Sequence, residues 1–291
     1  MTQPFKFQST LALGVSLLAI TAPAHAIDGV RWGEGIGLYV GVDSRITIPT
    51  GTFAGMANPN AGRLTLLFDH GDHFHGIGAY SLTGTAAAPV VTPTSANNRL
   101  PEPYTVVSPA TAAIPLTAAG SGAYAGHWVS SVLAAGQPTY EYSHLGIASI
   151  QSLNDLSPAS DVLFHSSGDR WSANYQGVTV GLQLVNATAG LMVGFGNNLN
   201  VFGSSATYAL GAGGSFEAMP TFYVSESAAA GMYSAQFRLV NLGTNANVAN
   251  SGNFFFDFSV AQPIPEPQTW AMLLAGLAVV ASLAHKRRKT S

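Results

Sequence analysis

The stretch Met232-Tyr233-Ser234-Ala235-Gln236-Phe237-Arg238-Leu239-Val240 is the part of the chain that decides the fold class, because its apolar and polar residues alternate. Successive side chains of an extended strand point to opposite faces, so alternation is typical of a half-buried strand. The segment 253–260 has the same character, with Phe254, Phe256 and Phe258 on one face. These two segments predict a sheet.

The rest of the region between the two chain ends has a similar composition. Its apolar runs are short and rich in Val, Ile, Phe and Tyr, and Gly, Ala, Ser, Thr and Asn dominate the connections. This composition is typical of an all-β sandwich or barrel. We expect a mostly β, β-sandwich-like single domain with long loops and no amphipathic helix of useful length. The expected strands are 35–42, 63–68, 77–82, 140–153, 161–164, 178–186, 221–224, 231–240 and 253–260.

We expect the segment from Thr83 to Gly122 to be a loop, because six prolines interrupt it. It is either a surface excursion or a linker between two β subdomains. Because roughly 235 residues suit one β domain, we expect a single domain over residues 27–262.

The N-terminal residues 1–26 have the pattern of a signal peptide. They combine Lys6, an apolar run from Leu11 to Ile20 and the small-x-small sequence Ala24-His25-Ala26, which predicts cleavage after Ala26. The apolar run is shorter than the ~20 residues of a membrane span. We therefore expect an exported protein.

The C-terminal residues 263–291 combine Pro265-Glu266-Pro267, an apolar stretch from Trp270 to Ala284 and the basic cluster Lys286-Arg287-Arg288-Lys289. The apolar stretch predicts a transient stop-transfer helix or a weak anchor with its basic end in the cytoplasm. This three-part order resembles the PEP-CTERM sorting signal that exosortases process. The resemblance implies transpeptidation near the Pro-Glu-Pro sequence and delivery to the cell surface or to an exopolysaccharide matrix of a Gram-negative-type bacterium.

Charge and cysteine content exclude several classes of function. Between residues 27 and 262 there are thirteen Asp and Glu, six Arg and no Lys, which gives a net charge of −7. So acidic a region is a poor candidate for binding nucleic acid. The chain has no cysteine, so any metal must be held by His and carboxylates.

The sequence Asp69-His70-Gly71-Asp72-His73-Phe74-His75 concentrates five potential metal ligands in seven residues. If it is extended from His73 to His75, these two imidazoles project from one face and supply two nitrogen ligands. His70, Asp69 or Asp72 would then complete a zinc site. The alternative is a polar turn whose histidines hydrogen-bond one another and solvent.

More distant residues are weaker candidates. The distant candidate metal ligands are His127, His144 and His165, with Glu141 and Asp161 nearby in sequence. A single histidine beside an aromatic residue is more often packed than functional. The chain has no Gly-x-Ser-x-Gly, His-Glu-x-x-His or phosphate-binding glycine loop, so we expect no catalytic residues.

A wider likeness covers most of the region between the ends. The segments from Asn58 to Phe68, from His70 to Ser81 and from Asn97 to Glu102 are similar to the Zur-repressed PEP-CTERM proteins. The likeness extends more loosely through 141–143, 166–171 and 235–240. It implies production when zinc is scarce, because the zinc uptake repressor Zur silences such genes in replete cells.

Together these features predict a non-enzymatic, envelope- or surface-directed zinc-binding protein that scavenges or buffers metal under zinc limitation. Its processing partners would be signal peptidase and exosortase, and it would contact the exopolysaccharide or envelope. The C-terminal helix would tether it to the inner membrane before processing. Two alternatives stay open: a structural or adhesive biofilm matrix protein, and a zinc-dependent hydrolase.

Overall fold

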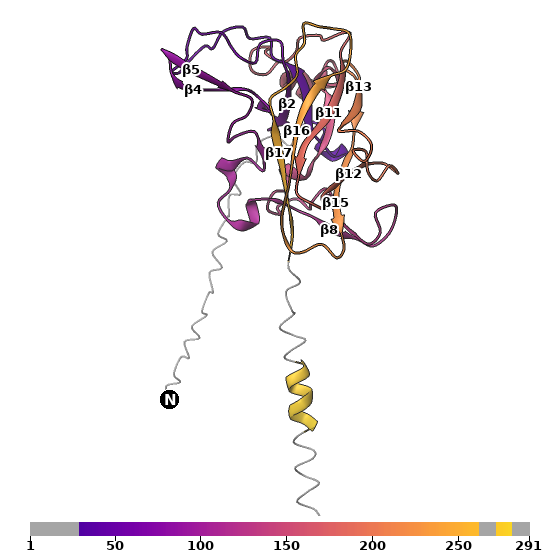
Figure 1. The fold of residues 1–291 in the computed structure, drawn as a ribbon. Helices are drawn as coiled ribbons and strands as arrows, with labels where there is room; N and C mark the ends of the chain where they lie inside the picture. The colour runs from indigo at the N-terminus through magenta and orange to yellow at the C-terminus, as the bar shows by residue number, and fades with distance from the viewer. Residues whose placement is uncertain (1–28, 262–271, 281–291) are drawn as a thin grey trace, which may run out of the picture.

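The computed structural model describes residues 29–261 and 272–280 of the chain (Figure 1). The predicted signal peptide with its cleavage site at Ala26, and the predicted sorting motif Pro265-Glu266-Pro267, lie outside the described residues. Residues 272–280 form a helix whose side chains are exposed. Among the described residues, no helix has both the length and the apolar character needed to cross a membrane.

Strands dominate the described residues, which confirms the mostly β fold class. The largest sheet has six strands in the order β13-β11-β16-β17-β6, with β7 also paired to β17. We refer to it as the six-stranded sheet. Its strands are β13 (Thr207–Ala212), β11 (Thr179–Ala187), β16 (Gly231–Asn241), β17 (Phe254–Val260), β6 (Arg99–Leu100) and β7 (Ile114–Pro115).

A second sheet of five strands has the order β14-β10-β1-β2-β3. Every residue of β1, β2 and β10 is buried, which is consistent with the mainly apolar sequences of these strands. We refer to it as the five-stranded sheet. Its strands are β14 (Glu217–Ala218), β10 (Gly146–Ser149), β1 (Ile36–Val42), β2 (Leu64–Asp69) and β3 (Phe74–Ile77).

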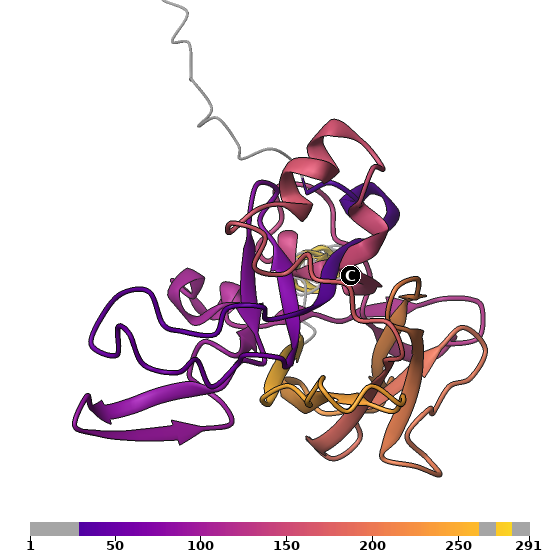
Figure 2. The same cartoon turned by 90° about the horizontal axis from the view of Figure 1, so that it is seen from above.

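Two smaller sheets complete the strand content of the described residues. One has the order β12-β15-β9-β8, and the other is the hairpin of β4 and β5, which projects away from the body in both views (Figures 1 and 2). The strands are β12 (Met192–Phe195), β15 (Pro220–Ser225), β9 (His127–Val129), β8 (Thr117–Ala119), β4 (Ser81–Thr85) and β5 (Ala88–Thr92).

The apolar core is continuous across the sheets. Phe254, Phe256 and Phe258 of β17 are fully buried, as the alternation predicts, and their rings pack with those of Phe222 on β15 and Phe237 on β16. Strand β2 of the five-stranded sheet also contacts β16 of the six-stranded sheet. The two largest sheets therefore share one core.

Short helices connect the strands, and one of them corrects a prediction. The segment 161–164, expected as a strand, is the end of α1 (Pro158–Phe164). The side chain of Ser157 caps this helix by accepting the amide of Ser160, and Pro158 occupies the first turn, so local start signals outweigh the short apolar run. The other helices within residues 29–261 are η1 (Trp32–Glu34), η2 (Pro103–Thr105), η3 (Pro109–Thr111), η4 (Glu141–Ser143) and η5 (Ile150–Leu153).

Three further segments differ from expectation. The strand predicted at 77–82 is divided between the end of β3 and the start of β4, because the chain turns at Gly78, whose φ is +79°. The long strand predicted at 140–153 is only β10, flanked by η4 and η5. The segment from Thr83 to Gly122, expected as a loop, contains β5 to β8 and the end of β4. Its prolines are compatible with these strands because the strands are short and lie at sheet edges or in the isolated hairpin.

Candidate metal centre

The hairpin of β2 and β3 places three histidines together. Phe68 of β2 lies opposite His75 of β3, and the backbone amide of His70 donates to the carbonyl oxygen of His73 at 3.0 Å. Because side chains alternate across a hairpin, His70, His73 and His75 share one face with Phe68. Ring contacts confirm this arrangement: the centroids of His70 and His75 are 4.1 Å apart, and those of His73 and His75 are 5.0 Å apart.

The turn between the two strands depends on Gly71. Its φ of +89° lies in the left-handed region, which costs a residue with a side chain more than it costs glycine. The amide of Gly71 donates to Oδ1 of Asp69 at 2.6 Å. This bond closes the turn on the buried side of the hairpin.

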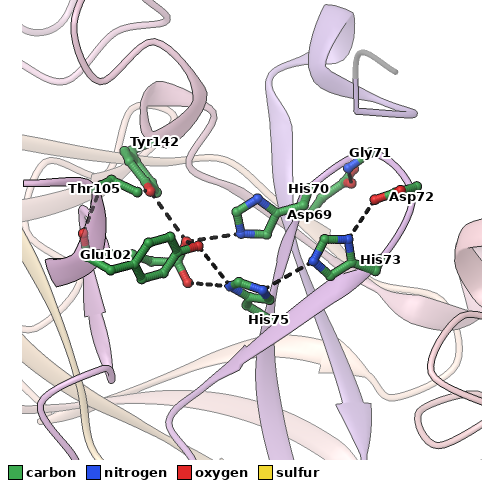
Figure 3. A network of polar contacts seen from close by, with 10 residues as sticks. Asp69, His70, Gly71, Asp72, His73, His75, Glu102, Thr105 and Tyr142 are labelled. Atoms are coloured by element: carbon green, nitrogen blue, oxygen red, sulfur yellow. Dashed lines mark hydrogen bonds and ion pairs between the residues drawn. The ribbon is translucent and has the colours of Figure 1, made fainter. Parts of the chain in front are cut away.

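Glu102 reaches the histidines from a different part of the fold. It follows β6 of the six-stranded sheet by two residues and begins the turn into η2 (Pro103–Thr105). Its carboxylate accepts hydrogen bonds from Nε2 of His70 at 3.0 Å and from Nδ1 of His75 at 2.7 Å (Figure 3). One ligand atom from each of His70, His75 and Glu102 lies within 4.8 Å of the others.

Two tyrosines hold the Glu102 carboxylate in place. Its Oε2 accepts the hydroxyl of Tyr104 at 2.8 Å and that of Tyr142 at 3.3 Å. Burial raises the pKa of Glu102, but the hydrogen bonds from His70, His75 and Tyr104 outweigh burial and lower the pKa to about 2. Glu102 is therefore an anion at neutral pH although it is only 3% exposed.

His73 and Asp72 lie on the solvent side of this group. Nδ1 of His73 is 2.6 Å from Oδ1 of Asp72, and Nε2 of His73 is 3.2 Å from Nε2 of His75. The hydrogen bond from His73 lowers the pKa of Asp72. Both residues are exposed, and neither belongs to the close group of His70, His75 and Glu102.

Asp69 lies apart from the group. It pairs with Phe74 across the hairpin, so alternation directs it to the face opposite the histidines, and it is fully buried. Burial raises the pKa of Asp69 to about 6, against the opposing hydrogen bond from the Gly71 amide. Its Oδ2 has no hydrogen-bond partner among the described residues.

His144 and His165 are also elsewhere. His144 is buried and its ring stacks on Trp32 at 5.2 Å, which matches the packed alternative. His165 is at the surface after α1, where its Nδ1 lies 2.5 Å from Oδ1 of Asp169, and this hydrogen bond raises its pKa. Neither joins the close group of His70, His75 and Glu102.

Glu102 was missed as a candidate ligand by reasoning from residue spacing. The available signal was weak: Glu102 is a carboxylate between Pro101 and Pro103, and from 77 to 98 the chain has no charged residue or histidine. Its contact with His75, 27 residues earlier in the chain, follows only from the pairing of β6 with β17.

Two imidazole nitrogens and one carboxylate oxygen form a ligand set that suits Zn²⁺ and other divalent transition metals. Such a set leaves one position of a tetrahedral metal open. Comparison of this chain with protein families, with curated proteins and with solved structures found no match. The geometry of His70, His75 and Glu102 is therefore the observation that identifies the candidate site.

Proposed function

We propose that this protein binds zinc, or a similar divalent transition metal, through His70, His75 and Glu102, and that it scavenges or buffers this metal outside the inner membrane. The observation that carries the proposal is the convergence of three ligand atoms within 4.8 Å from two separate parts of the fold. A buried carboxylate anion facing two imidazoles gives a divalent cation both charge and geometry.

The proposal includes the setting of the protein. Residues 1–26 would be a signal peptide and residues 263–291 a PEP-CTERM segment, so that signal peptidase and exosortase process the chain on its way to the surface. Residues 27–262 would form a β-sandwich-like domain. Membership of the Zur-repressed PEP-CTERM family would explain production under zinc limitation and agrees with a zinc site at the His-rich hairpin.

The direct test is calorimetric titration of the purified protein with zinc. We expect one submicromolar site, which is lost when His70 and His75 are both replaced by Ala. The matched control is His165→Ala, which removes an exposed histidine that lies in another cluster. Absence of binding in the wild type, or equal affinity in the double variant, would contradict the metal function.

A second candidate function is a structural or adhesive matrix protein, and one observation favours it. The β4–β5 hairpin projects from the body, carries no charge, and exposes Val90 by 53% and Val91 by 52%. A deletion strain in zinc-limited medium separates the two functions. Metal scavenging predicts poor growth, whereas a matrix role predicts altered biofilm with normal zinc acquisition.

The third candidate, a zinc-dependent hydrolase, depends on the fourth coordination position. A hydrolytic zinc keeps a water there beside a general base. X-ray absorption of the zinc-loaded protein would distinguish the cases, since a closed site without bound water excludes hydrolysis. We favour the non-enzymatic function.

A further inference from the structure

A continuous chain of polar contacts leads from the surface to the candidate metal ligands (Figure 3). It starts at Oδ1 of Asp72, 2.6 Å from Nδ1 of His73. It continues from Nε2 of His73 to Nε2 of His75 over 3.2 Å, and from Nδ1 of His75 to Oε1 of Glu102 over 2.7 Å. The solvent exposure of the side chains falls along this series of contacts: Asp72 and His73 are exposed, His75 is half-buried and Glu102 is buried.

The two nitrogens of His75 have different surroundings. Nδ1 faces the carboxylate of Glu102 and the hydroxyl of Tyr104, 3.1 Å away, whereas Nε2 faces only His73 among the hydrogen-bond contacts of the described residues. A metal ion that binds His75 together with Glu102 therefore takes Nδ1. A neutral imidazole can offer the lone pair of Nδ1 only when its hydrogen is on Nε2.

When a metal ion takes the place of the Nδ1 hydrogen that Glu102 accepts, the hydrogen of neutral His75 is on Nε2 and needs an acceptor, and His73 is placed to be that acceptor. Nε2 of His73 has a free lone pair when the hydrogen of that ring is on Nδ1, where the Asp72 carboxylate accepts it. In the metal-bound state the contacts thus select one tautomer in each ring, with the hydrogen of His75 on Nε2 and that of His73 on Nδ1. Metal-bound histidines in proteins are commonly oriented in this way by an acceptor on their second nitrogen.

Stacking on His70 holds the ring of His73 in place. It stacks on His70 with centroids 5.1 Å apart and an angle of 11° between the ring planes. The ring face of His73 therefore packs on His70, its Nδ1 contacts Asp72 and its Nε2 contacts Nε2 of His75. His73 thus contacts both imidazole ligands from the solvent side.

We infer that Asp72 and His73 are positioning residues, which fix the tautomer and the ring orientation of His75, and that neither binds the metal directly. This inference rests on the proposed zinc site of His70, His75 and Glu102. It replaces the interpretation of His73 and Asp72 as metal ligands that spacing along the sequence suggested.

The test compares His73→Phe and His73→Gln with the wild type and with His75→Ala, all as the full chain titrated with zinc. Phe keeps the ring that stacks on His70 but removes both nitrogens, so we expect a dissociation constant about 10- to 100-fold higher. Gln offers an amide oxygen to Nε2–H of His75, so it should recover part of the loss. His75→Ala removes a ligand and should abolish submicromolar binding.

X-ray absorption at the zinc edge separates positioning from ligation. If His73 only positions His75, the wild type and His73→Phe have the same number of histidine nitrogens around zinc. Loss of one histidine nitrogen in His73→Phe would overturn the inference, and so would an unchanged dissociation constant in that variant.

The outcomes for the two proposals are distinguishable. If the wild type binds no zinc, or if His75→Ala binds as tightly as the wild type, the metal function itself fails. If His75→Ala loses binding while His73→Phe keeps the wild-type affinity, only the positioning role fails. Because His73 and Asp72 are exposed, variants at both positions should fold, and circular dichroism of the metal-free proteins checks this.

Asp72 gives an independent check through a double-mutant cycle. Asp72→Ala should weaken zinc binding less than His73→Phe, because Asp72 acts one contact further from the metal. When both changes are combined, the loss of zinc affinity should equal that of His73→Phe alone, since Asp72 acts on His75 only through His73. Fully additive effects would contradict this shared action.

Discussion

Glu102 shows how a buried charge becomes useful at a ligand position. An isolated carboxylate is expensive to bury, but this one accepts hydrogen bonds from two histidines and two tyrosines. Burial and the hydrogen bond to Glu102 raise the pKa of Tyr104, so its phenol keeps its proton and remains a donor. The charge and orientation of the carboxylate are thus set before a cation arrives.

Replacing Glu102 with Gln tests this charge directly. The variant keeps the size of the side chain and removes its negative charge, so we expect zinc affinity to fall by about 100-fold or more, which corresponds to about 3 kcal/mol. Calorimetry measures the change, with Glu226→Gln at an exposed position as the control. Equal losses in the two variants would mean that overall charge, and not the site, attracts the metal.

Asp69 predicts a pH dependence of folding stability. Its pKa is about 6 in the folded protein against about 3.9 in an unfolded chain, so the folded state holds the proton more tightly. The stability that this group contributes is full below pH ~4 and is lost as the pH rises through about 6. The amide introduced by Asp69→Asn does not ionise, so relative to the wild type this variant should gain about 1–3 kcal/mol between pH 4 and pH 7.5.

Urea denaturation at both pH values, with a chelator present, measures this gain for Asp69→Asn. The other titrating groups are common to both proteins, so the difference between the proteins isolates Asp69. A difference that stays constant from pH 4 to pH 7.5 would contradict the raised pKa.

At the scale of elements, the two-residue strand β6 has a large effect because it delivers Glu102. It pairs in parallel with β17, where Arg99 lies opposite Phe255. The guanidinium of Arg99 forms an ion pair with the buried carboxylate of Asp257 and lies 4.7 Å from the ring centroid of Phe255. One arginine thus fixes both the register and the position of β6.

Replacing Arg99 with Met should disturb stability and metal binding together. It leaves Asp257 buried without its cation, which should cost about 1–3 kcal/mol, since the arginine is partly exposed. It also loosens the segment that leads to Glu102, so zinc affinity should fall. Thermal unfolding and calorimetry measure the two effects, with the exposed Arg238→Met on β16 as the control.

The sequence predicts elements well where side-chain pattern and burial agree. Strands β11, β15, β16 and β17 lie within one residue of their predicted bounds, because each has enough alternating or apolar residues to specify a face. The helix α1 and the strands between Thr83 and Gly122 were not predicted. Their positions follow from a local cap and from pairing with distant strands, and neither effect appears in a periodic pattern.

The candidate site shows the same difference between residues that local sequence places and residues that distant strand pairing places. His70 and His75 are predictable because one turn brings them together, and a turn is encoded by neighbouring residues. Glu102 is not, because its position results from the pairing of β6 with β17, whose partner residues are more than 150 positions apart. The side chains of Asp69 and His70 lie on opposite faces of the hairpin because the backbone is still extended at the end of β2. Residue spacing alone does not show where that strand ends.

At the scale of the whole molecule, the site connects the two largest sheets. His70 and His75 belong to the hairpin of the five-stranded sheet, and Glu102 follows a strand of the six-stranded sheet. A bound metal would act as a cross-link between sheets that otherwise share an apolar core. Metal binding should therefore stabilise the fold as a whole.

Thermal unfolding with and without zinc measures this stabilisation. At a free zinc concentration 100 times the dissociation constant we expect about 2.7 kcal/mol, which raises the melting temperature by roughly 5–10 °C for a domain of this size. At the same zinc concentration the rise should shrink to about 1–2 °C or less in Glu102→Gln and should be unchanged in Glu226→Gln. An equal rise in Glu102→Gln would place the stabilising metal elsewhere.

The pairing of β6 with β17 also has a consequence for the order of events during synthesis. The ribosome makes the His-rich hairpin and Glu102 early, and it makes β17, the strand that fixes their spacing, about 150 residues later. Until β17 has emerged, the three ligands lie on a chain with no fixed distances between them. A half-made copy therefore has no site of this kind, and only a finished, folded molecule competes for metal.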